Sequence, residues 1–231
     1  ADILRGGSGD DDLSGGSFDD VLNGGSGNDS LAGDEGADEL TGGSGNDTLN
    51  GGNGADQLVG GSGQDALTGG AGDDELRGGS GNDALDGGLG SDNLRGGAND
   101  DVLNGGEGRD SLRGDRGNDE LSGGAGRDYL SGAIGDDTLD GGADADRLYL
   151  GAGNDVATGG IGADTFIFRN DDLDGSQDLI LDYSVAEGDR LHLRGLDLGG
   201  SESEYSDWFG NHVSVSGEDV SIQLGNNTTL L

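Results

Sequence analysis

The amino-acid sequence predicts an all-β fold, a parallel β-solenoid of about nine coils with a C-terminal β capping region. Three observations lead to this fold class. A nine-residue period runs without an insertion from residue 6 to residue 167, leucine recurs once in almost every period, and six of the nine aromatic residues lie at or after Phe166. An unbroken period of this kind is typical of a repeat architecture. We therefore expect a repeat array in residues 1–167 and a capping region in residues 168–231.

The repeat array contains eighteen complete nonapeptides of the form G-G-x-G-x-D-x-L-x, preceded by the end of another in residues 1–5. Position six is aspartate in all nineteen rows, and position eight is leucine except at Ala157 and Phe166. Glycine fills 47 of the 54 places at positions one, two and four. We interpret these glycines as residues that adopt positive φ angles and let backbone carbonyls converge.

Each nonapeptide leaves room for only a short strand, because three residues such as Ser30-Leu31-Ala32 separate successive glycine-rich turns. We expect two nonapeptides to make one coil of the solenoid. Residues eighteen apart then stack about 4.8 Å from each other, which is the spacing between hydrogen-bonded strands. Aspartates eighteen apart therefore stack at the same spacing along each edge of the solenoid.

The composition argues against folding of the bare chain. The 231 residues include 55 glycines and only 29% hydrophobic residues, and the formal net charge is -37. Low hydrophobicity with high net charge is typical of disordered chains. The same charge excludes nucleic acid and an anionic membrane as partners of the whole molecule and favours cations. No apolar run reaches the roughly 18 residues of a membrane span.

The nonapeptide resembles the calcium-binding repeat of the repeats-in-toxin (RTX) family, also called the hemolysin-type repeat, over about 70% of the chain. The resemblance implies a parallel β-roll with a six-residue turn and a three-residue strand in each nonapeptide. It also implies calcium as the cofactor, a secreted, extracellular location and export by the type I secretion machinery. The resemblance further implies that each ion lies between one turn and the turn two nonapeptides later, so we expect eighteen turns to hold up to about 16 ions.

The chemistry of the repeat supports calcium independently. Carboxylates stacked at strand spacing repel one another, and calcium is a hard cation that takes six to eight oxygen ligands. One leucine per nonapeptide does not offset the entropy of ordering nine residues, so metal binding has to supply folding energy. The predicted metal ligands are Asp2, Asp11, Asp20, Asp29, Asp38, Asp47, Asp56, Asp65, Asp74, Asp83, Asp92, Asp101, Asp110, Asp119, Asp128, Asp137, Asp146, Asp155 and Asp164.

The capping region contains five segments with apolar residues in strand-like patterns, DTFIF, DLILDY, DRLHL, HVSVS and DVSIQL. Its first part resembles the region that closes the RTX portion of serralysin-type proteases and of alginate epimerase R-modules. That resemblance implies a role in nucleating the roll and in secretion. The segment NDDLDGSQD from Asn170 begins like an EF-hand loop, but Leu181 stands where a glutamate ligand is required. A plain acidic turn and an irregular calcium site both remain open there.

Catalytic motifs are missing from the sequence. The two histidines, His192 and His212, form no H-E-x-x-H motif, and the chain has neither a G-x-S-x-G elbow nor a cysteine. We interpret His192 as an exposed strand residue. The sequence therefore predicts a noncatalytic, calcium-binding RTX module that folds on extracellular calcium as part of a type I secreted protein.

Arginine recurs on one predicted face of the roll. Arg77, Arg95 and Arg113 occupy position nine at steps of eighteen, and Arg109 and Arg127 extend the row. One interpretation is local ion pairing with acids such as Glu75 and Asp110. The alternative is binding of a polyanion such as alginate or another polyuronate, as in a module of a carbohydrate-active enzyme, or a role in a surface adhesin.

Overall fold

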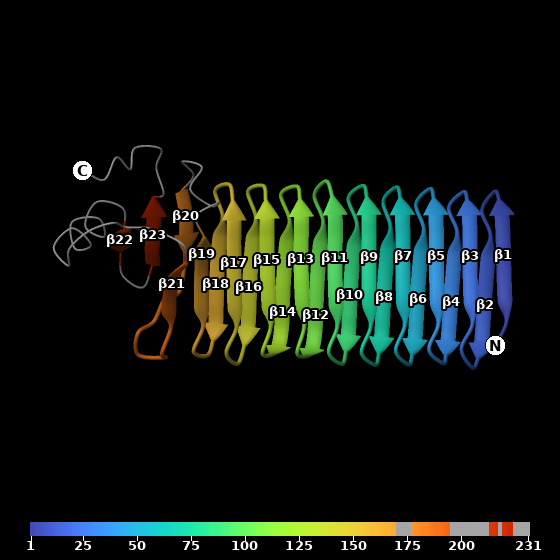
Figure 1. Cartoon of the computed structure of the whole chain (residues 1–231), viewed down its shortest axis with the longest axis horizontal. Coiled ribbons are helices and arrows are strands. Elements are labelled where there is room, and N and C mark those ends of the chain that lie inside the picture. Colours follow the sequence, from blue (N-terminus) through green and yellow to red (C-terminus); the bar gives the residue numbers. More distant parts are fainter. Residues whose placement is uncertain (170–176, 195–212, 217–218, 224–231) are drawn as a thin grey trace.

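The computed structural model describes residues 1–169, 177–194, 213–216 and 219–223 of the chain. These residues form 23 strands and no helix. The strands stack side by side along a rod, with the N-terminus at one end and β20 to β23 at the other (Figure 1). Within the described ranges, no helix meets the length and hydrophobicity needed to cross a membrane.

Two sheets make up the rod. The odd sheet has eleven strands in the order β1-β3-β5-β7-β9-β11-β13-β15-β17-β19-β21, and the even sheet has twelve in the order β2-β4-β6-β8-β10-β12-β14-β16-β18-β20-β23-β22. The odd sheet contains β1 (Ile3–Ser8), β3 (Val21–Ser26), β5 (Glu39–Ser44), β7 (Gln57–Ser62), β9 (Glu75–Ser80), β11 (Asn93–Ala98), β13 (Ser111–Arg116), β15 (Tyr129–Ile134), β17 (Arg147–Ala152), β19 (Thr165–Arg169) and β21 (Arg190–Arg194).

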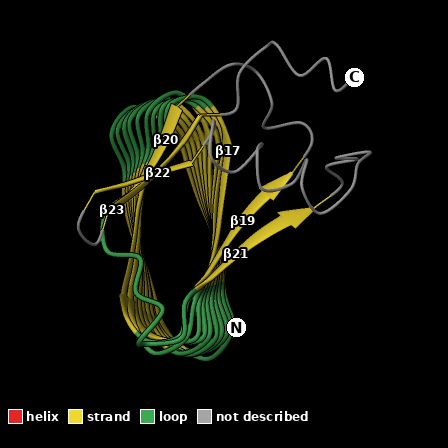
Figure 2. Cartoon of the chain, turned by 90° about the vertical axis from the view of Figure 1, so that its left-hand side faces the viewer, coloured by secondary structure: helices red, strands yellow, loops and turns green. Residues whose placement is uncertain are grey.

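The even sheet contains β2 (Asp12–Ser17), β4 (Ser30–Glu35), β6 (Thr48–Asn53), β8 (Ala66–Ala71), β10 (Ala84–Leu89), β12 (Val102–Gly108), β14 (Glu120–Gly126), β16 (Thr138–Ala143), β18 (Val156–Ile161), β20 (Gln177–Ile180), β22 (Val213–Ser216) and β23 (Asp219–Gln223). Seen along the rod, the two sheets face each other and are joined by turns at two edges (Figure 2). The predicted all-β parallel solenoid is confirmed.

Strands of successive coils pair in parallel with a shift of eighteen residues. Leu22 pairs with Leu40, and Leu40 pairs with Leu58. This register confirms that two nonapeptides make one coil. The strands, however, are six residues long rather than three, because positions two and three also pair with the next coil, as Gly7 does with Gly25. The prediction of three-residue strands was therefore wrong in length.

Leucine at position eight fills the space between the sheets. From Leu22 to Leu148 these side chains are at most 2% exposed. Leu4 and Leu13, in the first coil, are only partly buried. Because inward-facing positions alternate along each strand, glycine at position one lies inside as well. The core of the repeat array is therefore a single column of leucines along each sheet.

The stack continues past residue 167 by one irregular coil. Strand β21 pairs in parallel with β19, and β20 pairs in parallel with β18. Then β23 adds to β20 antiparallel, and β22 adds to β23. Each of the five predicted segments contains a strand, and His192 is exposed on β21 as expected. The EF-hand-like residues 170–176 and His212 lie outside the described residues.

Candidate metal centre

The turns of the roll present their aspartates in two rows, one along each edge. We call the first edge the row of turns that leads from the odd sheet to the even sheet; its aspartates are Asp11, Asp29, Asp47, Asp65, Asp83, Asp101, Asp119, Asp137 and Asp155. The second edge leads back to the odd sheet, and its aspartates are Asp2, Asp20, Asp38, Asp56, Asp74, Asp92, Asp110, Asp128, Asp146 and Asp164. From Asp20 onward every one is buried, whereas Asp11 is half-buried and Asp2 exposed.

One oxygen of each buried carboxylate is bound to the neighbouring coil. Oδ1 of Asp83 accepts a hydrogen bond of 2.9 Å from the backbone N–H of Asp65. The same bond recurs at every step of eighteen residues from Asp29 to Asp164, at 2.7–2.9 Å. These bonds fix each side chain in one orientation inside its turn.

The other oxygen has no protein donor. We call the two rows of position-six aspartates the ladder. From Asp20 to Asp146, Oδ2 of each ladder aspartate is buried and accepts no hydrogen bond. A buried acceptor without a donor costs free energy, and native structures contain few of them. A periodic row of such atoms beside the backbone carbonyls of the turns is a set of oxygen ligands that suits a cation.

Glycine at position one makes room for this carboxylate. A methyl group added to Gly123 would lie 2.7 Å from Oδ2 of Asp128 in the same turn, and 2.5 Å from the carbonyl oxygen of Gly141 in the next coil. Position one of the repeat is absent from the residues with positive φ, so the interpretation of this glycine as a left-handed residue was wrong. The requirement at position one is space next to the aspartate.

Positions two and four do carry positive φ, and they bring carbonyl oxygens between the turns. A methyl group on Gly45 would overlap the carbonyl oxygen of Gly27 in the coil before. The turn conformation persists where the sequence departs from glycine. Six such residues have φ between 76° and 85°: Phe18, Asp34, Asn99, Asp115, Ala133 and Asp144. Backbone carbonyls and carboxylates thus line the same turns.

Burial changes the protonation of the ladder. It raises the pKa of Asp83 to about 6, that of Asp101 to about 7 and that of Asp137 to about 8. Neighbouring aspartates raise these pKa values further, but burial is the larger cause. The sequence argument placed repulsion first, whereas loss of solvation dominates in the folded turns.

The sequence analysis missed two aspartates that continue the ladder. Oδ1 of Asp178 accepts a hydrogen bond of 3.1 Å from the Asp155 N–H, and Oδ1 of Asp189 accepts one of 2.9 Å from the Asp164 N–H. They lie 23 and 25 residues after their partners, so a search at fixed period misses them. Both keep an apolar residue two positions later, Ile180 and Leu191, as in the D-x-L of the repeat.

Side chains alone do not complete a metal site. In the part of the chain that the structure describes, no three aspartate, glutamate, histidine or cysteine side chains cluster around one point. An ion bound in the turns would therefore take most of its ligands from backbone carbonyls. Calcium accepts such mixed oxygen ligands readily.

A family model for the RTX calcium-binding nonapeptide repeat matches residues 5–40, 23–58, 32–67, 59–94, 95–130 and 131–166. The chain belongs to this family. Its RTX roll is a calcium-binding structural module. A search of curated proteins found no match.

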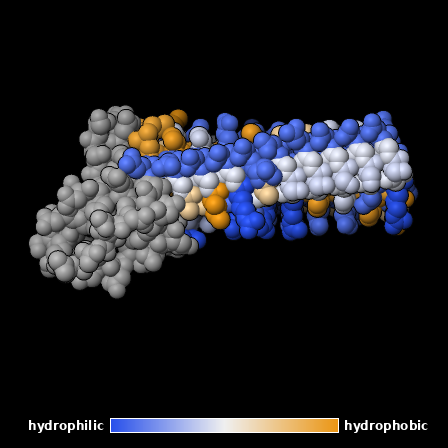
Figure 3. Space-filling model, turned by 90° about the horizontal axis from the view of Figure 1, so that it is seen from above, coloured by the Kyte–Doolittle hydropathy of each residue, from blue (hydrophilic) through white to orange (hydrophobic). Residues whose placement is uncertain are grey.

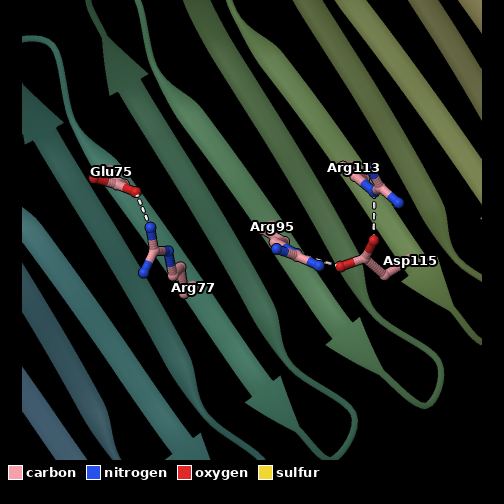
Figure 4. Close-up of polar contacts among 5 residues, drawn as sticks. All are labelled: Glu75, Arg77, Arg95, Arg113 and Asp115. Carbon is pink, nitrogen blue, oxygen red and sulfur yellow. Dashed lines mark hydrogen bonds and ion pairs between the residues drawn. The ribbon is translucent and has the colours of Figure 1, made fainter.

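The arginines of the RTX roll lie on one side of it. Arg77, Arg95 and Arg113 are direct neighbours on β9, β11 and β13, as expected from their spacing. Arg77 forms an ion pair with Glu75, and Asp115 pairs with both Arg95 and Arg113 (Figure 4). Asp110 is instead bound to the backbone of the second edge.

A shallow groove of about 680 Å³ follows this arginine row. Its lining includes Arg77, Arg95, Arg113, Asp115 and Arg116. All eleven arginines of the chain belong to odd-sheet strands or to the turns that enter them, and the even sheet has none. The arginines of the RTX roll are thus confined to the strands of the odd sheet and to the turns of the second edge.

Proposed function

We propose that the position-six aspartates bind calcium and that this binding drives folding of the roll outside the cell. The module is then the noncatalytic part of a type I secreted protein. The observation that carries the proposal is the row of buried Oδ2 atoms without donors, next to glycines that leave space beside them. We assign no catalytic residue in this chain.

The donor set fits calcium better than magnesium. Calcium takes six to eight oxygens in flexible geometry, whereas magnesium requires near-octahedral geometry and retains its waters. Each turn offers a fixed carboxylate and several carbonyl oxygens. Residues 1–167 carry 35 acids and 8 arginines, a net charge of -27, so up to about 16 dications would nearly neutralise the array.

Folding that depends on extracellular calcium suits export of the chain. Extracellular calcium modules bind with dissociation constants on the order of 10⁻⁴ to 10⁻³ M, weak enough to stay empty in the cytosol. An unfolded, highly charged chain is a suitable substrate for the type I secretion machinery, and extracellular calcium then folds it. In this proposal the capping region, residues 168–231, supplies the end against which the first coils form.

The decisive experiment is a calcium titration followed by far-UV circular dichroism, with magnesium as the control cation. We expect a cooperative gain of β structure with calcium alone. The variant Asp83→Ala should lose one or two central sites and shift the transition to higher calcium. Its matched control is Asp86→Ala, which removes an exposed carboxylate three residues away. A chain already folded in chelator, or equal shifts in both variants, would contradict the proposal.

A second candidate function is polyanion binding by the arginine face. It is favoured by the confinement of every arginine to one side and by the groove along Arg77, Arg95 and Arg113. Arginine recognises carboxylates through paired hydrogen bonds, and calcium loading would reduce the opposing charge of the turns. This activity suits a carbohydrate-active enzyme module or an adhesin.

A gel shift of the calcium-loaded protein with alginate tests this second function. We expect retention that disappears when Arg77, Arg95 and Arg113 are all replaced by alanine. The charge-matched control replaces Arg5, Arg147 and Arg190, which do not line the groove. No retention of the unmodified protein, or equal loss in both variants, would rule out the arginine row as the binding site.

A further inference from the structure

The two edges of the roll differ at position five, directly before the ladder aspartate. On the first edge this position always has a carboxylate or a carboxamide: Asp10, Asn28, Asn46, Gln64, Asn82, Asp100, Asn118, Asp136 and Asn154. On the second edge it varies: Asp19, Ala37, Ala55, Asp73, Ser91, Arg109, Arg127, Ala145 and Ala163. The sequence of the turns therefore repeats every eighteen residues and not every nine.

Figure 3 looks down on the first edge, where a hydrophilic row runs along the rod beside a paler band. Seven of the nine position-five side chains of this edge accept a hydrogen bond from a backbone N–H of the next coil, and in the described residues Gln64 and Asn82 do not. The Asn46 N–H donates to Asn28 Oδ1 at 2.8 Å, and the Gln64 N–H donates to Asn46 Oδ1 at 2.9 Å. The other donors are the N–H groups of Asn28, Asn118, Asp136 and Asn154, and Gln177 extends the row.

The second edge has only two such bonds in the same described coils. They join the Ala37 N–H to Asp19 and the Ser91 N–H to Asp73. Alanine at Ala37 and Ala55 offers no side-chain acceptor to the next turn. The backbone N–H directly before the position-six aspartate is therefore bonded to the previous coil in seven turns of the first edge and in two turns of the second.

Such ties lower the cost of binding. A ligand that binds a turn already held in place orders fewer backbone torsions than one that binds a loose turn. Each bond forms as its coil folds onto the coil before, so it adds to the stability of the calcium-loaded turn. We propose that the first edge binds calcium at lower concentrations than the second, and that its position-five residues are the positioning residues responsible. This inference rests on the calcium-binding function proposed above.

Equilibrium dialysis against calcium, with circular dichroism on the same samples, tests the order of filling. Two binding classes of similar size are expected, and most of the gain in β structure accompanies the first. A single class in which β structure rises in proportion to bound calcium overturns the inference and leaves calcium binding intact. Absence of bound calcium would instead refute the proposed function itself.

Removal of the acceptors should weaken only the first class. The variant Asn28→Ala/Asn46→Ala/Asn118→Ala is expected to weaken that class about two- to tenfold per affected turn, the equivalent of one hydrogen bond. Its control is Asn23→Ala/Asn50→Ala/Asn93→Ala, three exposed strand asparagines of identical composition. A parallel shift of both classes would mean that the acceptors only stabilise the fold, and the inference would be wrong.

Installation of acceptors should have the opposite result. In Ala37→Asn/Ala55→Asn, the second edge gains two acceptors that face Ala55 and Asp73 of the following coils. The second class should then move toward the first, and the first should stay unchanged. An unchanged second class in this variant would contradict a positioning role.

Discussion

The repeat coils and the closing coil of this roll differ in how they fill their core and in how they pair their buried aspartates. From Asp20 to Asp146, each half-coil of the repeats buries one leucine, and its aspartate keeps a buried Oδ2 atom without a donor. We call the last coil, formed by β19, β20 and β21, the closing coil. It buries Phe166, Phe168 and Ile180. There, Oδ2 of Asp189 accepts a 2.8 Å hydrogen bond from the Ser184 N–H, and its Oδ1 accepts one from Asp164.

This difference separates two ways of completing a coil. A repeat coil has a small apolar core and buried carboxylate oxygens without donors, so we expect its stability to depend on a bound cation. The closing coil has a larger apolar core, and backbone N–H groups of Asp164 and Ser184 satisfy both oxygens of the Asp189 carboxylate. Asp182 is likewise bound by the N–H groups of Gly159 and Gly160. We expect the closing coil to act as a metal-independent end for a metal-dependent array.

Acidification should produce the largest effect, because burial raises the pKa of the position-six aspartates from Asp38 to Asp146 and of Asp164. In the folded, metal-free chain the pKa values of Asp83, Asp101 and Asp137 are raised by burial to about 6, 7 and 8, above the unfolded value of about 3.9. Protonation therefore favours folding. This contribution is complete below about pH 4 and is lost as the pH rises through the folded values.

Far-UV circular dichroism in chelator between about pH 8 and pH 5 measures this effect. The metal-free chain should gain β structure as the pH falls, and calcium binding near neutral pH should release protons. A spectrum that stays constant over this range would show that the unfilled carboxylates are not what keeps the metal-free chain unfolded.

Loss of the aromatic core of the closing coil should come next. The variant Phe166→Ala removes a fully buried ring and should lower the free energy of unfolding by about 3–5 kcal/mol. Urea unfolding in saturating calcium measures the change. If the closing coil is the end on which the array forms, the calcium midpoint of the whole roll also rises. If only the closing coil loses stability and the calcium midpoint of the repeat array stays the same, the two regions fold independently.

A smaller effect is expected from Gly123→Ala. The added methyl lies 2.7 Å from Oδ2 of Asp128, so the turn has to shift, at a cost of about 1–3 kcal/mol in the calcium-loaded roll. Ala125→Gly is the control, because it removes an exposed methyl from the same turn. Equal calcium affinity in Gly123→Ala and the unmodified protein would show that the space beside this carboxylate and the Gly141 carbonyl oxygen is not used.

The smallest effect is expected from Asp189→Asn. The amide replaces one acceptor, so about 1 kcal/mol of stability should be lost, and the number of bound calcium ions should stay the same. In contrast, Asp110→Asn alters a carboxylate whose Oδ2 has no donor and should reduce that number. Calcium counting by dialysis distinguishes the two variants, and an equal loss of ions would remove the distinction between the regions.

Much of this fold follows from the sequence, because a strict nine-residue period fixes the register of every coil. Leucine at position eight indicated the core, and the spacing of Arg77, Arg95 and Arg113 placed them side by side. The role of glycine at position one was not predictable from its conformational freedom, since the carboxylate that needs the space comes five residues later. Asp178 and Asp189 were missed because the period breaks before them, although the local D-x-apolar pattern persists.

The inequality of the two edges limits how the length of such an array can change. An insertion or deletion of eighteen residues adds or removes one coil and leaves every other turn on its own edge. A change of nine residues transfers all later turns to the opposite edge and exchanges the odd and even faces beyond that point. The row of arginines and the row of position-five acceptors would both break there. Duplications of whole coils are therefore the changes in length that keep both rows continuous.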